Sequence, residues 1–233
     1  MIRFAFLAIT LLAAPAARAQ FGSEASITYF GVGGNALDTG NLSDRIGARG
    51  YGSLEPGGVG FATARYQFRG RLVGGIEGHT TQRDEARNGA FEASLSGRYA
   101  TLNVGYLAYS TERLKLYPLV GGGYGDLTLR LYEDATDPDF DGTLDNPRRG
   151  SSLSSRGWLL NAGLGGDFIV PIRKSEDHTR GLAFGLRAGY LLDLSSGDWE
   201  QFSEFGVDGG PEASLAGPYL RLLIGFSSVE AGR

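Results

Sequence analysis

The acidic segment from Asp137 to Asp145 has aspartates at the spacing of a metal-binding loop. Its four aspartates occupy the first, third, fifth and ninth positions of a calcium loop, with Gly142 at the sharp turn. The twelfth position, where a bidentate glutamate is expected, is Arg148, and no helical pattern flanks the segment. It is therefore either an acidic, solvated loop or a weak calcium site completed by backbone carbonyls or water. The candidate ligands are Asp137, Asp139, Asp141 and Asp145.

Histidine is scarce, which limits acid–base chemistry. The chain has only His79 and His178, and His79 is followed by two threonines. A histidine that is hydrogen-bonded to both a serine and a carboxylate can activate the serine to cleave or transfer an acyl group. No His-x-Ser pattern accompanies His79, and Ser195 or Ser196 could meet it only through the fold. We therefore predict no catalytic residue and no enzyme, and keep a lipid-modifying enzyme that uses His79 as an alternative.

Seven charged residues occur singly within segments that are otherwise apolar and rich in glycine. In Gly181–Leu194, every even position from Leu182 to Leu192 is apolar, and the odd positions hold mostly small residues and the only charges. Successive side chains of a strand point to opposite faces, so one face is apolar and the other is small and charged. Opposite charges on such a face could neutralise one another inside a narrow barrel. The predicted interior network comprises Glu77, Arg98, Arg130, Asp167, Arg187, Asp193 and Arg221.

The same alternation recurs along the chain and predicts about eight strands. They are expected at residues 25–34, 57–68, 71–79, 90–109, 114–132, 157–170, 181–194 and in a last segment that ends near Phe226. Within residues 90–109 the apolar positions shift by one residue near Ala100, which predicts a β-bulge.

The connections between these strands differ in length. Residues 35–56, 133–156 and 195–213 form long connections, residues 69–70 and 110–113 form short ones, and two others are intermediate. Outer-membrane barrels have short periplasmic turns and longer outer loops. The order of the lengths places every long connection outside the cell.

Two outer connections carry helical signals. Trp199, Phe202 and Phe205 recur every three residues after Asp198, a residue suited to a helix N-cap. This spacing predicts a short helical turn that folds its aromatic rings over the barrel mouth, or else an exposed binding patch. A second short helix is expected within residues 41–50.

The N-terminus and the composition indicate export. Arg3, an apolar run and Ala17-Arg18-Ala19 have the layout of a secretory signal peptide, so we predict a signal peptide at residues 1–19 and one barrel domain at residues 20–233. Cysteine is absent, which excludes disulfides and thiolate metal sites. The formal net charge is −4 and no basic run is present, so no nucleic-acid partner is expected.

Glycine is enriched on the face opposite the apolar one. The chain has 38 glycines in 233 residues, against a usual share of about 7%. Leu72-Val-Gly-Gly-Ile-Glu-Gly-His79 and the closing Gly217-Pro-Tyr-Leu-Arg-Leu-Leu-Ile-Gly-Phe226 resemble strands of small eight-stranded outer-membrane β-barrels, uncharacterised Gly-rich members included. The second resembles their final strand, which the assembly machinery reads, although seven residues follow Phe226. The resemblance implies an all-β fold, an antiparallel transmembrane β-barrel in the outer membrane of a diderm bacterium, and implies no activity.

The sequence therefore predicts a monomeric barrel with a structural or cell-surface interaction role through its long outer loops. Strands of about twenty residues exceed the 9–11 that span a bilayer and are expected to project beyond it. The expected partners are outer-membrane lipids and a surface protein. A small pore is the other functional alternative, and a soluble periplasmic sandwich or lipocalin-like barrel is the structural one.

Overall fold

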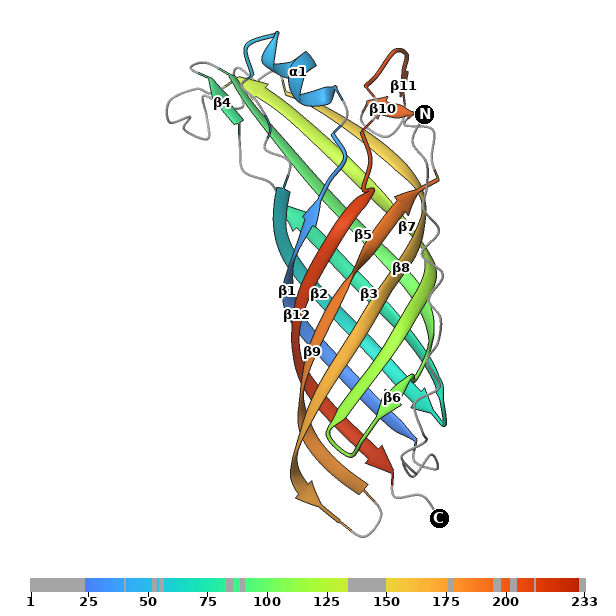
Figure 1. The fold of residues 1–233 in the computed structure, drawn as a ribbon. Helices are drawn as coiled ribbons and strands as arrows, with labels where there is room; N and C mark the ends of the chain where they lie inside the picture. The colour runs from blue at the N-terminus through green and yellow to red at the C-terminus, as the bar shows by residue number, and fades with distance from the viewer. Residues whose placement is uncertain are drawn as a thin grey trace.

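The strands of this protein close into one antiparallel ring (Figure 1). The computed structural model describes residues 24–39, 41–51, 54, 57–82, 86–88, 91–133, 150–175, 178–194, 198–201, 205–211 and 213–230. Eight strands form the ring: β1 (Ala25–Ala36), β2 (Gly57–Arg69), β3 (Leu72–Gln82), β5 (Phe91–Tyr106), β7 (Leu114–Glu133), β8 (Ser151–Lys174), β9 (His178–Asp193) and β12 (Gly217–Glu230). Closure is made by β1 and β12, which pair from Ala25 with Val229 to Asn35 with Tyr219.

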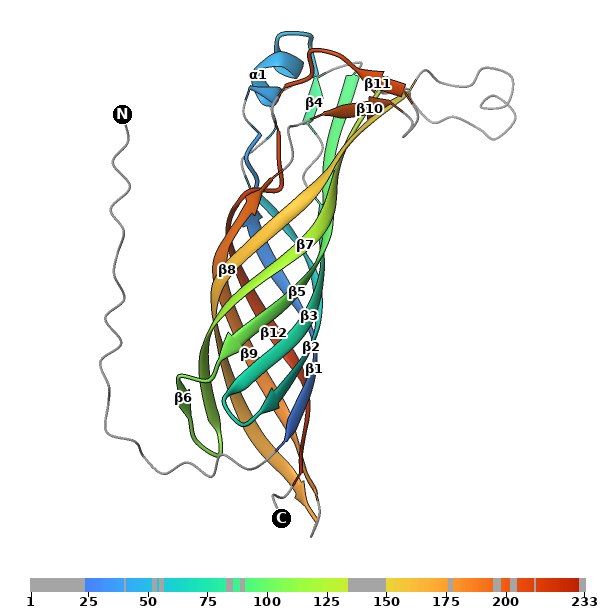
Figure 2. The same ribbon diagram turned by 90° about the vertical axis from the view of Figure 1, so that its right-hand side faces the viewer.

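Smaller elements lie at the two ends of the ring. One end carries α1 (Leu42–Gly47), β4 (Ala86–Asn88), β10 (Trp199–Gln201) and β11 (Phe205–Val207), and the other carries β6 (Tyr109–Ser110) (Figures 1 and 2). The end with β6 holds the tight connections, such as the one at Gly70, whose positive φ of 59° suits a residue without a side chain. It also holds the start of β1 and the end of β12, so it is the periplasmic end of the barrel.

The outer surface of the ring is a belt of apolar side chains. Leu102 and Val104 on β5, Leu164 on β8 and Leu222 on β12 are each more than half exposed. A soluble protein rarely exposes an apolar surface that encircles it, whereas hydrocarbon accepts a closed ring whose backbone groups are all paired. Trp158 and Tyr190 near one edge of the belt, and Phe168 and Phe226 near the other, match the aromatic girdles of such barrels. The predicted fold class, an outer-membrane β-barrel of eight antiparallel strands, is therefore confirmed, and residues 1–19 lie outside the described part of the chain.

In the described segments, no helix has the length and apolar character needed to cross a membrane.

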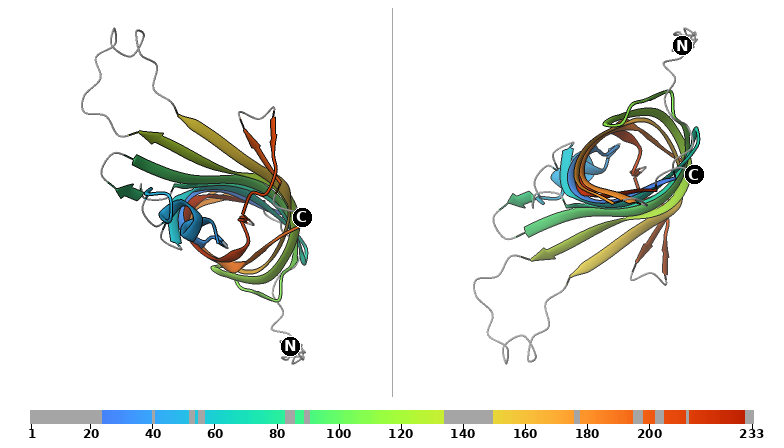
Figure 3. Two further views of the ribbon diagram at one scale, coloured as in Figure 1. Left: turned by 90° about the horizontal axis from the view of Figure 1, so that it is seen from above. Right: turned by 90° about the horizontal axis from the view of Figure 1, so that it is seen from below.

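The interior has two apolar clusters, one toward each end. The periplasmic cluster contains Ile27, Tyr29, Tyr66, Tyr117 and Ile169 among others. The second cluster, which we call the outer core, fills the opposite end. It contains side chains from α1, from the outer halves of β5 and β7, and from residues 213–219. Its members are Leu37, Leu42, Ile46, Leu54, Ala93, Leu95, Tyr99, Leu127, Leu129, Leu159, Leu191, Trp199, Ala213, Leu215 and Tyr219. Seen along the barrel axis, α1 lies at the mouth of the ring, and β5, β7 and β8 run away from it to one side (Figure 3).

The outer core explains two predictions that were wrong. The pairing of β5 with β7 is continuous from Phe91 to Gly105, so the shift of apolar positions near Ala100 is not a bulge. Ala93 and Leu95 instead face inward, whereas Leu102 and Val104 face outward. Beyond the membrane the outside of the strand meets water, so its apolar side chains turn to the interior.

The aromatic spacing after Asp198 also predicts the wrong element. Trp199–Gln201 and Phe205–Val207 are paired strands, not a helical turn. Trp199 is buried in the outer core, and its indole Nε1 donates a hydrogen bond to the Pro211 carbonyl oxygen at 2.7 Å. The short helix expected within residues 41–50 is present as α1.

Candidate functional site

Four charged side chains from four strands meet inside the barrel at mid-height. Glu77 lies on β3, Asp167 on β8, Arg187 on β9 and Arg221 on β12. Each has an odd residue number, and the alternation of its strand directs the side chain at that position inward. All four are at most 3% exposed, so the cluster is shielded from bulk water.

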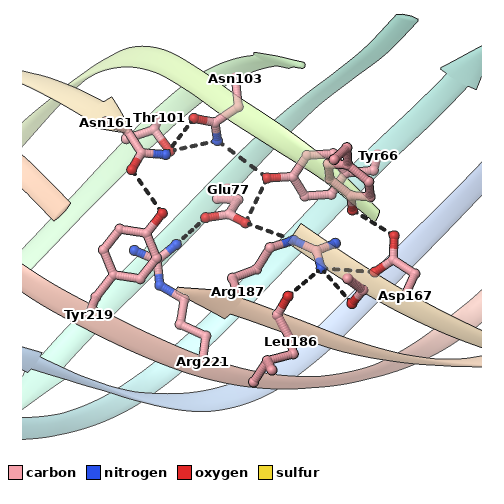
Figure 4. A network of polar contacts seen from close by, with 12 residues as sticks. Tyr66, Glu77, Thr101, Asn103, Asn161, Asp167, Leu186, Arg187, Tyr219 and Arg221 are labelled. Atoms are coloured by element: carbon pink, nitrogen blue, oxygen red, sulfur yellow. Dashed lines mark hydrogen bonds and ion pairs between the residues drawn. The ribbon is translucent and has the colours of Figure 1, made fainter. Parts of the chain in front are cut away.

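These four residues form a chain of ion pairs across the lumen (Figure 4). The guanidinium of Arg221 donates to Glu77 Oε2, and Arg187 Nε lies 3.9 Å from Glu77 Oε1. Arg187 Nη1 is 2.8 Å from Asp167 Oδ1. Two positive and two negative charges therefore balance within the low-dielectric interior, where an unpaired charge would be strongly destabilising.

Tyrosines surround the cluster and bind both carboxylates. The Tyr66 hydroxyl donates to Glu77 at 2.7 Å and the Tyr117 hydroxyl donates to Asp167 at 2.6 Å. The Arg187 guanidinium also lies over three rings, with its Cζ 5.4, 4.8 and 5.1 Å from the centroids of Tyr29, Tyr66 and Tyr117. Such cation–π contacts stabilise a desolvated arginine by about 2 kcal/mol.

Two amide side chains extend the network toward the outer core. Asn161 donates to Asn103 Oδ1 at 2.7 Å, and the Tyr219 hydroxyl donates to Asn161 Oδ1 at 2.9 Å (Figure 4). The Tyr219 ring in turn lies 3.9 Å from the Arg221 guanidinium carbon. The polar network thus spans the lumen from wall to wall and is continuous with the apolar cluster above it.

Glycine makes room for the tyrosine rings. A Cβ added at Gly75 would lie 2.4 Å from the Tyr66 ring, and one added at Gly165 would lie 2.4 Å from the Tyr117 ring. No real Cβ approaches an aromatic carbon so closely, so these positions require glycine. The glycine-rich inner face is therefore matched to the large aromatic side chains that fill the lumen.

Sequence reasoning missed the tyrosines of this site. Tyr117 fits the periplasmic girdle by its position near a strand end, yet it is 2% exposed and points inward. The signal that could have identified it is its separation of two residues from Leu119, which places both side chains on the same, inward face of β7.

Three of the seven predicted interior charges lie apart from the cluster. Arg98 and Arg130 point outward from β5 and β7, which corrects their predicted place in the lumen. Arg98 forms an ion pair with Asp126 on the outer surface, and its side chain is 73% exposed. Asp193 is half-buried at the outer end of β9, where it accepts a hydrogen bond from the Leu215 amide at 3.3 Å.

His79 faces the interior and not the lipid. Its ring stacks on that of Tyr99 at 5.2 Å, and Nδ1 lies 3.1 Å from the Thr81 hydroxyl. Its Nε2 has no hydrogen-bond partner among the residues that the structure describes. Ser195 and Ser196 lie outside the described residues, so the lipid-modifying alternative stays a prediction.

The predicted calcium segment, Asp137 to Asp145, also falls outside the described residues and stays a prediction. Within the segments that the structure does describe, no group of three or more histidine, aspartate or glutamate side chains is arranged to hold a metal ion.

Known proteins of similar fold are small outer-membrane barrels. A scan against protein families finds no match. The chain is similar to the attachment invasion locus protein Ail of Yersinia pestis, with 13% identity over 88% of this chain and 97% of that one and a TM-score of 0.42. It is also similar to a major outer membrane protein of Thermus thermophilus (13% identity, 89% and 99% covered, TM-score 0.44) and to OprG of Pseudomonas aeruginosa (10% identity, 89% and 95% covered, TM-score 0.36). At these values the similarity concerns the fold alone, and the outer-membrane assignment rests on the geometry of the barrel.

Proposed function

We propose that this protein is a sealed outer-membrane barrel that acts at the cell surface as a structural and interaction protein. The observation that carries the proposal is the contrast between its lumen and its outer end. The lumen is filled at two levels, whereas three strands continue past the membrane as an ordered sheet.

The filled lumen supports a role other than conduction. The ion-pair cluster of Glu77, Asp167, Arg187 and Arg221 crosses the interior, and the outer core lies between it and the mouth. An eight-stranded barrel has an interior just wide enough for side chains, so such a filling leaves no continuous water path.

The outer sheet supports an interaction role. Beyond the apolar belt, β5 pairs with β7 and β7 with β8, and β4 and β10 extend the sheet on either side. One face of this outer sheet rests on the outer core, and the opposite face carries exposed charges such as Arg130 and Arg156. A rigid polar sheet with short edge strands can bind a partner by its face or by adding a strand at an edge.

The purified full-length chain should give no unitary conductance in planar bilayers, because charged and apolar side chains occupy its lumen. A porin reconstituted under the same conditions supplies the positive control. Discrete, reproducible current steps from the heat-modifiable folded protein would overturn the sealed-barrel proposal in favour of a small pore.

The outer sheet should be reachable from outside the cell. Because the chain has no cysteine, a variant with one introduced cysteine reports a single site. Arg130→Cys on the outer sheet should react with a membrane-impermeant maleimide on intact cells, whereas Glu112→Cys in the turn before β7 should react only after the outer membrane is permeabilised. The reverse pattern would show an inverted barrel and end the surface role.

A further inference from the structure

A groove runs along the lipid-facing wall of the barrel. It has a volume of about 550 Å³, and its floor is made of two small residues, Gly78 on β3 and Ala100 on β5, which pair directly. Phe30 and Phe61 stand on one side and Tyr124 on the other. All three aromatic side chains are substantially exposed, from 48% for Tyr124 to 73% for Phe61, so the hollow opens outward toward lipid.

The groove continues into a polar upper part. A second hollow of about 350 Å³ shares four residues with the first, namely Phe61, Thr80, Arg98 and Asp126. It adds the polar residues Ser96 on β5 and Thr128 and Arg130 on β7, and on its opposite side the exposed valines Val32 and Val59. On β5 and β7, Arg98 pairs with Asp126, two residues beyond the pair Ala100 and Tyr124. At this level the outward-facing residues of the two strands change from apolar to charged. The combined groove therefore crosses the outer edge of the apolar belt.

The polar part of the groove has a positive balance. Among the described residues that line this part, two are arginines, Arg98 and Arg130, and one is a carboxylate, Asp126, to which Arg98 donates through Nε. An arginine has five N–H donors, and Arg98 uses only Nε toward Asp126, so within the described part of the chain its terminal nitrogens can bind a second anion. Ser96 and Thr128 add hydroxyls that can bond to a sugar.

We propose that this groove binds one phosphorylated glycolipid of the outer leaflet, of the lipid A class. An acyl chain lies over Gly78 and Ala100 between the aromatic walls, and a sugar phosphate lies against Arg98 and Arg130. The lining passes from apolar residues to Arg98, then to the hydroxyls of Ser96 and Thr128, and last to Arg130. It can therefore hold hydrocarbon below and, above it, a sugar that carries two phosphates. The inference goes beyond the proposed surface role, because it concerns the lipid-facing wall of the barrel and shares only Arg130 with the polar face of the outer sheet.

Filling the groove should displace the lipid. A Cβ at Gly78 would meet its nearest neighbour, Thr63 Cγ2, at an ordinary 3.5 Å, so Gly78→Leu can fold while its side chain occupies the floor. We expect Gly78→Leu to weaken binding of bisphosphorylated lipid A about tenfold, as if roughly two methylene groups were no longer buried. The matched control is Gly74→Leu on the same face of β3, where an added Cβ meets nothing within 4 Å and which lies outside the groove.

Binding is measured by native mass spectrometry of the full chain, refolded in detergent and titrated with lipid A. Heat-modifiable gel migration confirms that each variant is folded. Arg98→Gln and Arg130→Gln should each weaken binding about fivefold, because a basic residue near a membrane surface contributes about 1 kcal/mol toward an anionic lipid. Dephosphorylated lipid A and phosphatidylglycerol should both bind more weakly than lipid A.

Three outcomes would overturn the proposal. Equal binding by Gly78→Leu and Gly74→Leu would show that the acyl chain does not use the groove. Equal binding of dephosphorylated lipid A would remove the role of the arginines. Binding of phosphatidylglycerol as tight as that of lipid A would assign the groove to phospholipids.

Discussion

Replacing Glu77 by glutamine is expected to lower the free energy of unfolding by about 3–5 kcal/mol, the loss found when one partner of a buried ion pair is removed. Glu77 accepts from Arg221 and from the Tyr66 hydroxyl, and it also faces Arg187. The amide keeps the shape of the side chain but removes its charge. Arg221, which is 1% exposed, would then be buried without its carboxylate.

The loss is measured by urea titration of the protein in bilayers, with the folded fraction read from unheated gel migration. Glu24→Gln is the matched control, because Glu24 pairs with Arg69 at 2.8 Å while the two side chains remain 54% and 84% exposed. An exposed pair contributes about 1 kcal/mol or less. If the two variants were equally stable, the interior cluster would not contribute to the stability of the barrel.

Much of the membrane-embedded half of the fold could be predicted from the sequence. In Gly181–Leu194 the even positions face lipid and Arg187 faces the interior, because a single environment lies on each side of the strand throughout its length. The alternation also directs Glu77 and Arg221 inward. The partners of these charges could not be predicted, since residues 144 positions apart meet only through the tilt and stagger of the closed ring.

One physical cause underlies the errors at Ala100, Arg98 and Arg130. Strands β5 and β7 leave the membrane partway along their length, and there the environment outside them changes from hydrocarbon to water. On β5, Leu102 and Val104 below that line face outward to lipid, whereas Ala93 and Leu95 above it face inward. If one apolar face is assumed along the whole strand, the sequence predicts a bulge near Ala100. The same assumption places Arg98 and Arg130 in the lumen, although both face outward.

A substitution in the outer core can test whether the apolar side chains of β5 change from the outward to the inward face above the membrane. Leu95 and Leu102 lie on the same strand, but Leu95 is 1% exposed in the outer core and Leu102 is 68% exposed toward lipid. Leu95→Ala should leave a cavity and destabilise the outer core by roughly 2–5 kcal/mol. Because α1 packs into this core through Leu42 and Ile46, opening of α1 should become more frequent.

Trypsin cleavage at Arg45 in α1 and at Arg49 in the turn after it reports that opening in the protein held in bilayers. A destabilisation of about 2 kcal/mol corresponds to cleavage roughly thirtyfold faster for Leu95→Ala. Leu102→Ala removes the same atoms from a site where lipid fills the space, so its cleavage rate should match that of the unaltered protein. Equal cleavage rates for the two variants would mean that Leu95 faces the same environment as Leu102. A bulged strand with a single lipid-facing side requires that result. The change of the apolar face above the membrane would then be refuted.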